Sequence, residues 1–277
     1  MTIIIGAALC GIVVGILSGL LGVGGGTMMV PIFRLGFGLS ALASTGTSLF
    51  AMIFTAAAGS ITHIRNKTCI ASLGLIAGVC GACTSPFGVR LANMSPAWLV
   101  MLATGLVIAS SAYTMLRKGL ALPKPGSKAA PTEGDGETAS APVEEPAFIS
   151  PKDLTPRQYI IGAVAGLVAG VAGGYVGLGG GFLMVPIFVA GVGLPMKQTS
   201  GTSLIAVCIL AISGAIAQAS YGNVELMAGI AMAAGSIPGA MVGANYIRRI
   251  PERSLRILFG VFLLVLSGAL VVNEILF

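Results

Sequence analysis

The chain has 277 residues and a formal net charge of +6, but only 9% of its residues are charged and 56% are hydrophobic. Soluble globular domains carry roughly 25% charged residues, so this composition excludes a soluble protein. Apolar runs of membrane-spanning length recur along the sequence, and they are continuous rather than alternating, which excludes a β-barrel. We predict an all-α polytopic membrane protein. Its basic residues lie at the ends of apolar runs, where membrane topology needs them, and do not indicate nucleic-acid binding.

Five apolar segments are predicted in each half of the chain. The first has no basic region before it, so we interpret it as a retained segment rather than a signal peptide. The second segment in each half is too short to span a bilayer comfortably. The predicted segments are 3–21, 27–36, 44–62, 70–90 and 97–116, and then 158–176, 182–192, 199–220, 226–247 and 254–276.

An internal repeat organises the sequence. Residues in the first half match residues 155 positions further along, without a gap: Val30-Pro31-Ile32-Phe33 matches Val185-Pro186-Ile187-Phe188, and Gly46-Thr47-Ser48-Leu49 matches Gly201-Thr202-Ser203-Leu204. We therefore predict a first membrane repeat over 1–117 and a second over 158–277. The segment 118–157 between them is rich in Pro, Gly, Ala, Ser and Glu, which predicts a disordered cytoplasmic linker.

The charges indicate that the two repeats have inverted topology. His63, Arg65 and Lys67 lie in one loop, whereas the matching loop at 221–225 has no basic residue. The second repeat instead has its basic cluster at Arg248, Arg249, Arg253 and Arg256, with Lys197 one loop earlier, and the counterparts of Arg248 and Arg249 are uncharged. The positive-inside rule then places both termini on the non-cytoplasmic side, with the first two segments of each repeat forming a Gly-broken hairpin.

The two glycine motifs, "GVGGG" from Gly22 and "GLGGG" from Gly177, each precede a new helix. A helix start offers unpaired N–H groups and partial positive charge, and glycine lets a ligand approach them. Inverted repeats broken at matching positions are typical of secondary transporters. A nucleotide loop is excluded, because neither motif has the required Lys or a βαβ context. Close helix packing is the alternative. The predicted substrate-binding residues are Gly24, Gly25, Gly26, Gly179, Gly180 and Gly181.

Hydroxyl residues gather at the predicted start of the third segment in each repeat. They are Ser44, Thr45, Thr47 and Ser48 in the first repeat, and Thr199, Ser200, Thr202 and Ser203 in the second. Such residues can cap a helix N-terminus, or they can donate hydrogen bonds to a bound anion. For substrate binding we select Thr47, Ser48, Thr202 and Ser203.

His63 is the single histidine, and its repeat counterpart is Gln218. We expect His63 to be solvated at the membrane interface, with proton coupling as the alternative. Arg90, like Arg34 and Lys197, can attract an anion at the mouth of a pathway or act as an interfacial anchor. No carboxylate lies deep in an apolar segment. The Cys80 and Cys83 pair indicates small packing surface rather than metal or redox chemistry, and we predict neither a metal nor a cofactor.

The chain resembles the TauE/SafE family of sulfite exporters and related anion permeases. The resemblance rests on "GLLGVGGGTMMVPIF" with "STGTSLF", and on "GGYVGLGGGFLMVPIF" with "QTSGTSLIA". It covers both repeats and leaves the linker unmatched. The resemblance implies a bacterial or archaeal inner-membrane carrier that moves sulfite or small organosulfonates, usually outward.

These observations predict a secondary transporter for a small sulfur-containing anion. Alternating access would move one repeat against the other around a midplane site at the repeat interface. The alternative is a passive anion channel for the same substrates. An enzyme is not predicted, because no nucleophile–base pair, metal cluster or cofactor motif is apparent. Beyond the anion and membrane lipid no partner is implied, and the oligomeric state is not predicted.

Overall fold

The computed structural model describes residues 2–121, 149, 154–246 and 252–276, and within these residues all regular structure is helical. Two short π-helical segments, η1 (Ile32–Gly36) and η3 (Phe188–Val192), continue α2 and α7. The helices are α1 (Thr2–Leu21), α2 (Gly26–Pro31), α3 (Ala41–Arg65), α4 (Ala71–Met94), α5 (Ala97–Ala121), α6 (Pro156–Val176), α7 (Gly181–Ile187), α8 (Met196–Ser220), α9 (Leu226–Tyr246) and α10 (Glu252–Leu276).

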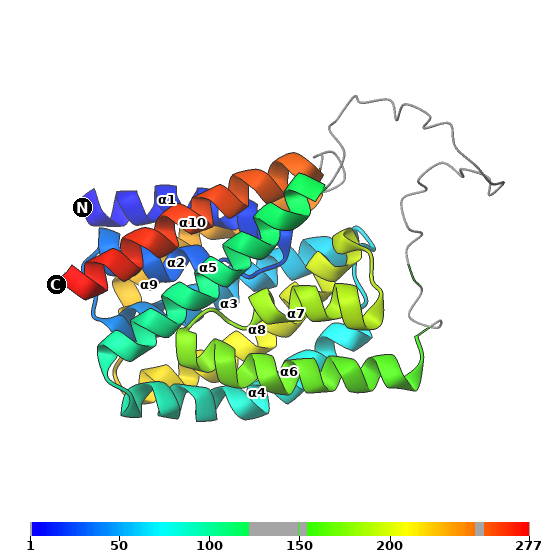
Figure 1. Ribbon diagram of the computed structural model, residues 1–277, viewed down its shortest axis with the longest axis horizontal. Helices are drawn as coiled ribbons and strands as arrows, with labels where there is room; N and C mark the ends of the chain where they lie inside the picture. Colours follow the sequence, from blue (N-terminus) through cyan, green and yellow to red (C-terminus); the bar gives the residue numbers. More distant parts are fainter. Residues whose placement is uncertain (1, 122–148, 150–153, 247–251, 277) are drawn as a thin grey trace.

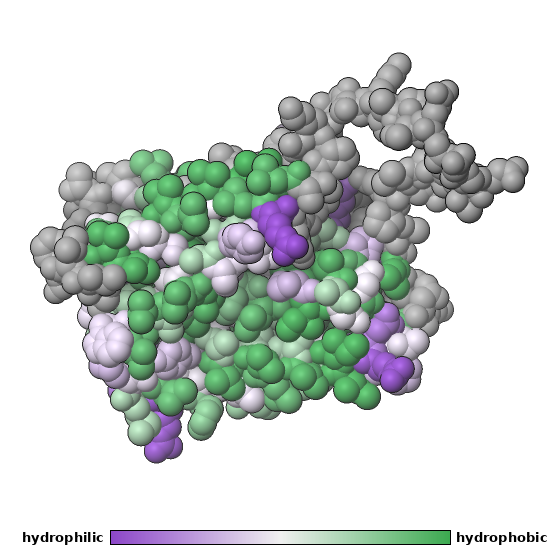
Figure 2. Space-filling model, in the orientation of Figure 1, coloured by the Kyte–Doolittle hydropathy of each residue, from purple (hydrophilic) through white to green (hydrophobic). Residues whose placement is uncertain are grey.

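The helices have the length and surface of a membrane protein. Among the described residues, α3, α4, α5, α6, α8 and α9 are each long and apolar enough to cross a bilayer. Large apolar side chains such as Phe87, Trp98 and Leu106 are more than half exposed. The face shown in Figure 2 is mostly apolar, and its strongly hydrophilic residues form only small groups. A soluble protein rarely exposes so much apolar surface, so the predicted polytopic all-α class is confirmed.

The helical path breaks at matching places in the two halves. α1 ends at Leu21 and α2 begins at Gly26, whereas α6 ends at Val176 and α7 begins at Gly181. We call residues 22–26 the first glycine turn and residues 177–181 the second. The N-cap residues Gly25 and Gly180 have φ values of 78° and 71°. Residues with a Cβ rarely adopt this left-handed conformation, so the backbone itself requires glycine at both breaks.

Helices from different halves of the chain pack together. α1 lies along α9, α4 lies along α6, and α5 lies beside α10 (Figure 1). Glycines permit the close approach: a Cβ on Gly15 would lie 2.9 Å from the Ala240 nitrogen, and one on Gly166 would lie 2.8 Å from the Ala77 carbonyl carbon. Small residues of this kind typically bring membrane helices together. The two halves therefore interlock rather than form separate domains.

α3 and α8 are the most buried of the membrane-length helices, and they pack against each other. Gly46, near the start of α3, approaches Asn223, just beyond the end of α8. Gly201, near the start of α8, approaches Thr68, just beyond the end of α3. The two helices therefore run in opposite directions. Both ends of the described chain lie at the same end of the bundle (Figure 1).

The predicted linker, 118–157, includes the end of α5 and the start of α6. α5 ends at Ala121, and α6 begins at Pro156. Ile149 is held by Gln198 near the start of α8: the Ile149 nitrogen donates to Gln198 Oε1 at 3.1 Å, and Gln198 Nε2 donates to the Ile149 oxygen at 2.7 Å. Most of the linker, for which disorder was predicted, lies outside the described residues. The basic pair Arg248 and Arg249 lies wholly outside them.

Candidate functional site

The two glycine turns meet where α3 and α8 cross. A Cβ on Gly24 would lie 2.6 Å from Val207 Cγ1 and 2.9 Å from Met52 Sδ. A Cβ on Gly179 would lie 2.5 Å from the same Met52 Sδ and 3.2 Å from the same Val207 Cγ1. The sequence analysis had not selected Met52 or Val207, because an apolar residue in an apolar helix carries no signal. The turns are thus packed against one pair of side chains.

The turns also touch each other through their backbones. A Cβ on Gly26 would lie 2.9 Å from Leu178 Cα, and a Cβ on Gly181 would lie 2.6 Å from the Val23 oxygen. All residues of both turns are buried. The six glycines predicted to bind substrate therefore lie in one compact region, in which a larger residue at Gly26 or Gly181 would push the two halves apart.

Each glycine turn is hydrogen-bonded to one serine of the opposite half. Ser48 Oγ donates to the Gly177 oxygen at 2.9 Å, and Ser203 Oγ donates to the Gly22 oxygen at 2.6 Å. These bonds are related by the same offset as the sequence repeat. In this conformation, the hydroxyls of both selected serines therefore hold the glycine turns in place by hydrogen bonds.

Thr47 and Thr202 form a second matched pair of bonds. Thr47 Oγ1 accepts from the Glu225 nitrogen at 2.9 Å, and Thr202 Oγ1 accepts from the Ile70 nitrogen at 2.9 Å. The first bond joins α3 to the residue before α9, and the second joins α8 to the residue before α4. Each threonine thus connects the two halves one position before the serine that holds the turn.

The capping interpretation of these hydroxyls is wrong. α3 begins at Ala41 with Ser40 as its N-cap, and Ser40 Oγ accepts from the Ala43 nitrogen at 3.2 Å. α8 begins at Met196 after Pro195. The Thr and Ser residues therefore lie inside the helices rather than at their ends. Ser40 is an ordinary N-cap residue, and Pro195 directly precedes the first residue of α8.

His63 is buried, so the expectation of a solvated interfacial side chain is wrong. Its exposed fraction is 0%. Nε2 lies 3.0 Å from the Gly19 oxygen, which can only accept, and Nδ1 lies 2.8 Å from Thr68 Oγ1. Thr68 Oγ1 also lies 3.2 Å from the His63 oxygen. His63 thus connects the end of α3 to the last turn of α1, directly before the first glycine turn.

Gln218, the repeat counterpart of His63, is buried in an uncharged network. Gln218 Nε2 donates to Thr45 Oγ1 at 3.3 Å, and Gln218 Oε1 accepts from Asn223 Nδ2 at 2.9 Å. Asn93 Nδ2 lies 3.4 Å from the same Gln218 oxygen. The two ends of the crossing therefore differ, because one has a titratable group and the other has only amides and a hydroxyl.

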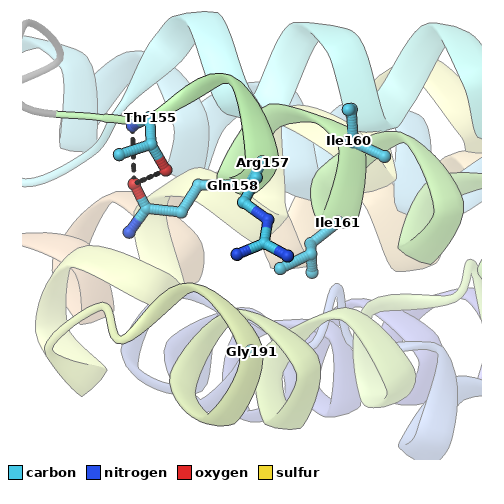
Figure 3. Close-up of a pocket in the computed structure, with 6 residues that line it drawn as sticks. All are labelled: Thr155, Arg157, Gln158, Ile160, Ile161 and Gly191. Carbon is cyan, nitrogen blue, oxygen red and sulfur yellow. Dashed lines mark hydrogen bonds between the residues drawn. The ribbon is translucent and has the colours of Figure 1, made fainter.

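Two of the predicted cations differ in their surroundings. Arg90 is exposed near the end of α4, and Arg34 is partly buried with its guanidinium donating to the Leu39 oxygen at 3.1 Å. A surface pocket lies at the start of α6, where Arg157 stands beside the Thr155 and Gln158 pair (Figure 3). The 21-residue α6 is about 30 Å long at 1.5 Å per residue, so this pocket is a helix length away from the second turn.

Alanine at position 203 is expected to destabilise the fold, because the Gly22 carbonyl would remain buried without its partner. A buried unpaired acceptor costs about 1–3 kcal/mol, which corresponds to a fall of about 3–10 °C in melting temperature. Thermal unfolding of purified Ser203→Ala in detergent measures this. Ser220→Ala is the matched control, since its hydroxyl is exposed and bonds only to the Ala217 oxygen. Equal melting temperatures for the two variants would contradict the fastening role.

The fold and the site define a polytopic membrane protein of the transporter class, in which helix breaks from both halves of the chain meet deep inside the bundle. Comparison with known proteins agrees. The family model described as "Sulfite exporter TauE/SafE" matches residues 7–270. The chain therefore belongs to the sulfite exporter TauE/SafE family of membrane transporters.

Curated relatives are similar over nearly their whole length. The probable membrane transporter protein YdhB of Bacillus subtilis (strain 168) is 26% identical over 244 residues, which cover 87% of this chain and 89% of the relative. The probable membrane transporter protein YunE of the same organism is 25% identical over 272 residues, covering 96% of each chain. No solved structure matches the chain.

Proposed function

We propose that this chain is a secondary transporter that exports a small sulfur-containing anion, sulfite or an organosulfonate, across a bacterial or archaeal inner membrane. The observation that carries the proposal is the contact between the two glycine turns at the crossing of α3 and α8. Membership of the sulfite exporter family supports the substrate class.

The glycine turns are the proposed binding site. The first backbone N–H groups of α2 and α7 begin at Gly26 and Gly181, where an α-helix has no internal acceptors for them. A helix start also carries partial positive charge, which favours an anion. Two such starts, in contact with each other and drawn from opposite halves, suit a small anion. The hydroxyls of Thr47, Ser48, Thr202 and Ser203 would then bind the anion directly or hold the turns in place.

Burial of the turns supports alternating access over a passive channel. Residues 22–27 and 177–182 are buried without exception. An open channel would leave such groups in contact with water throughout. Here a ligand reaches them only after helices move, which is the behaviour of a transporter whose site opens to one side at a time. A channel remains the rival function, and the two differ in whether flux saturates.

We propose that the repeats are inverted and that both termini face the non-cytoplasmic side. The opposite directions of α3 and α8 and the reciprocal bonds of Ser48 and Ser203 support this. The basic loop at Arg65 and Lys67 supplies the cytoplasmic assignment.

A reporter enzyme fused after Phe277 tests the topology. We expect an alkaline phosphatase fusion there to be active, because that enzyme requires the periplasm, and a green fluorescent fusion there to be dark. The same pair of reporters inserted into the linker between α5 and α6 should give the opposite result. A fluorescent fusion after Phe277 would contradict inverted repeats with external termini.

His63 is the proposed coupling residue. Its Nε2 donates to Gly19, while the Thr68 hydroxyl can donate to Nδ1 or accept from it. The same surroundings therefore accommodate a neutral and a protonated ring. Gly19 lies in the last turn of α1, so a change at His63 acts directly on the first glycine turn.

His63→Gln is expected to abolish transport driven by a proton gradient while leaving anion counterflow within about twofold of wild type, because exchange needs no net proton movement. Proteoliposome assays of both modes measure this. The control variant is Gln218→His, which adds a histidine at the matching site and should not restore coupling to His63→Gln. Unchanged proton-driven transport by His63→Gln would exclude the coupling role.

Binding measurements on the purified protein test the substrate class. Sulfite, sulfoacetate, taurine and thiosulfate are the probes, with chloride as the reference anion. We expect saturable binding of sulfite or sulfoacetate and none of chloride at the same concentrations. Failure of all four sulfur compounds to bind would refute the proposed substrate class.

A further inference from the structure

Two buried hydroxyl groups beside the first glycine turn have no hydrogen-bond partner in the described part of the chain. They belong to Ser18, which is 2% exposed, and Thr27, which is 0% exposed. Leaving a buried hydroxyl unpaired is unfavourable, so an unpaired one in a native fold calls for a bound water or a ligand. The two hydroxyls therefore mark a place where a polar partner is missing.

Both residues flank Gly25. Ser18 lies in the last turn of α1, where its carbonyl accepts from the Gly22 nitrogen at 2.9 Å. A Cβ on Gly25 would lie 3.5 Å from Ser18 Cβ. Thr27 is the second residue of α2, two positions after Gly25. The first glycine turn thus has one unpaired hydroxyl packed beside Gly25 and another in the helix that Gly25 begins.

The helices do not satisfy these hydroxyls internally. Buried threonines elsewhere bond to the carbonyl four residues earlier, as Thr55 does to Ala51 at 3.1 Å and Thr104 does to Val100 at 2.7 Å. This is the usual bond of a hydroxyl inside a helix. The hydroxyl of Ser18 makes no such bond, although the carbonyl four residues earlier, at Val14, lies inside α1. The residue four positions before Thr27 lies outside α2, so no helical carbonyl is in place for it.

The second glycine turn has no equivalent hydroxyls. The counterparts of Ser18 and Thr27 are Gly173 and Phe182. A Cβ on Gly173 would lie 2.5 Å from the Gly180 nitrogen, so α6 packs directly against its own turn and leaves no room for a side chain. Phe182 places an apolar ring where the first repeat has a hydroxyl. The two turns are therefore alike in backbone and different in chemistry.

We propose that the hydroxyls of Ser18 and Thr27 donate hydrogen bonds to the oxygen atoms of the transported anion, which binds against the first glycine turn rather than equally between the two. This inference rests on the proposed function and assigns its specificity to one repeat. A sulfur oxyanion has several acceptor oxygens, which suit two hydroxyl donors, whereas a halide has no comparable directional acceptors.

Affinity measurements with sulfite and sulfoacetate on the full chain test the inference. Ser18→Ala and Thr27→Val should each raise Kd about tenfold or more, as expected for the loss of a hydrogen bond to a charged group. Thr27→Ser keeps the hydroxyl and should bind within about twofold of wild type. Ser85→Ala is the matched control, because Ser85 is also buried and unpaired but touches Gly174 and Gly214 instead of the first turn. It should leave Kd unchanged.

The outcomes separate the inference from the proposed function. Wild-type protein that binds sulfite or sulfoacetate, with Kd unchanged in folded Ser18→Ala and Thr27→Val, would overturn the inference alone and leave the hydroxyls to bound water. An equal loss of affinity in Ser85→Ala would also overturn it. Wild-type protein that binds neither anion would overturn the inference together with the substrate class on which it rests.

Discussion

Valine in place of Gly25 or Gly180 is expected to abolish anion transport. Both glycines have left-handed φ values, 78° and 71°, at the starts of α2 and α7. A β-branched residue is strained there by at least about 1–2 kcal/mol, and it crowds the helix that precedes the turn, at Val14 and Ser18 in α1 for Gly25 and at Ala169 in α6 for Gly180. A Cβ on Gly180 would lie 2.6 Å from the Ala169 oxygen. Uptake into proteoliposomes, normalised to folded protein, measures the loss.

Gly25→Val is the more informative of the two variants. A Cβ on Gly25 would meet only side chains, with Val14 Cγ1 nearest at 3.0 Å, so the fold can adjust. Gly38→Val is the matched control, because Gly38 has φ of 65° and nothing within 4 Å of an added Cβ. It carries the same kind of backbone strain without crowding, and it should retain most transport. Normal transport by both Gly25→Val and Gly180→Val would refute the glycine-turn site.

Leucine in place of Gly15 is expected to remove most of the folded protein. Gly15 lies on the contact between α1 and α9, where a Cβ would be 2.8 Å from Ser236 Cα and 2.9 Å from the Ala240 nitrogen. These are backbone atoms, which cannot rotate aside, so the two helices would have to separate. Overpacking a core typically costs about 1–3 kcal/mol, and a clash between backbones lies at or above the upper end of that range.

Size-exclusion profiles of a fluorescent fusion in detergent measure this effect. Gly6→Leu is the matched control, since it puts the same residue on the same helix at a position with nothing within 4 Å of an added Cβ. We expect a monodisperse peak for Gly6→Leu and aggregate for Gly15→Leu. Monodisperse Gly15→Leu with a wild-type melting temperature would contradict the close packing of α1 on α9.

The apolar runs and the glycine motifs predicted the helices closely. α1 ends at Leu21 and α6 ends at Val176, as the predicted segments do, because glycine clusters interrupt the apolar runs abruptly. The sequence analysis placed the two glycine motifs in one site at the repeat interface, and in the structure both turns pack against Met52 and Val207. The local sequence pattern was sufficient to predict a helix end wherever a glycine cluster determined the backbone conformation.

Other features depend on contacts that no local pattern contains. The start of α3 was placed three residues too late, at Ser44 rather than at Ala41, although Ala41, Leu42 and Ala43 are apolar. The helix begins earlier because Ser40 caps it, with Oγ accepting from the Ala43 nitrogen at 3.2 Å. His63 appeared interfacial because Arg65 follows it, but Thr68 folds back onto its ring. The reciprocal bonds of Ser48 and Ser203 join residues far apart in sequence.

Departures from the repeat carried information that matches did not. Ser18 and Thr27 differ from Gly173 and Phe182, and these differences coincide with the unpaired hydroxyls. His63 differs from Gln218, and the two ends of the α3 and α8 crossing differ in the same way. In a duplicated transporter the shared residues set the framework, and the unshared ones are where the halves can take different roles.

Counterflow of labelled sulfite in proteoliposomes tests the central claim most directly. Vesicles loaded with unlabelled sulfite should accumulate external label transiently, with a rate that saturates as external sulfite rises, because a carrier exposes one site to one side at a time. Gly25→Val vesicles should show neither signal. A wild-type rate that rises linearly with concentration, without transient accumulation, would contradict alternating access at the glycine turns and favour a passive channel.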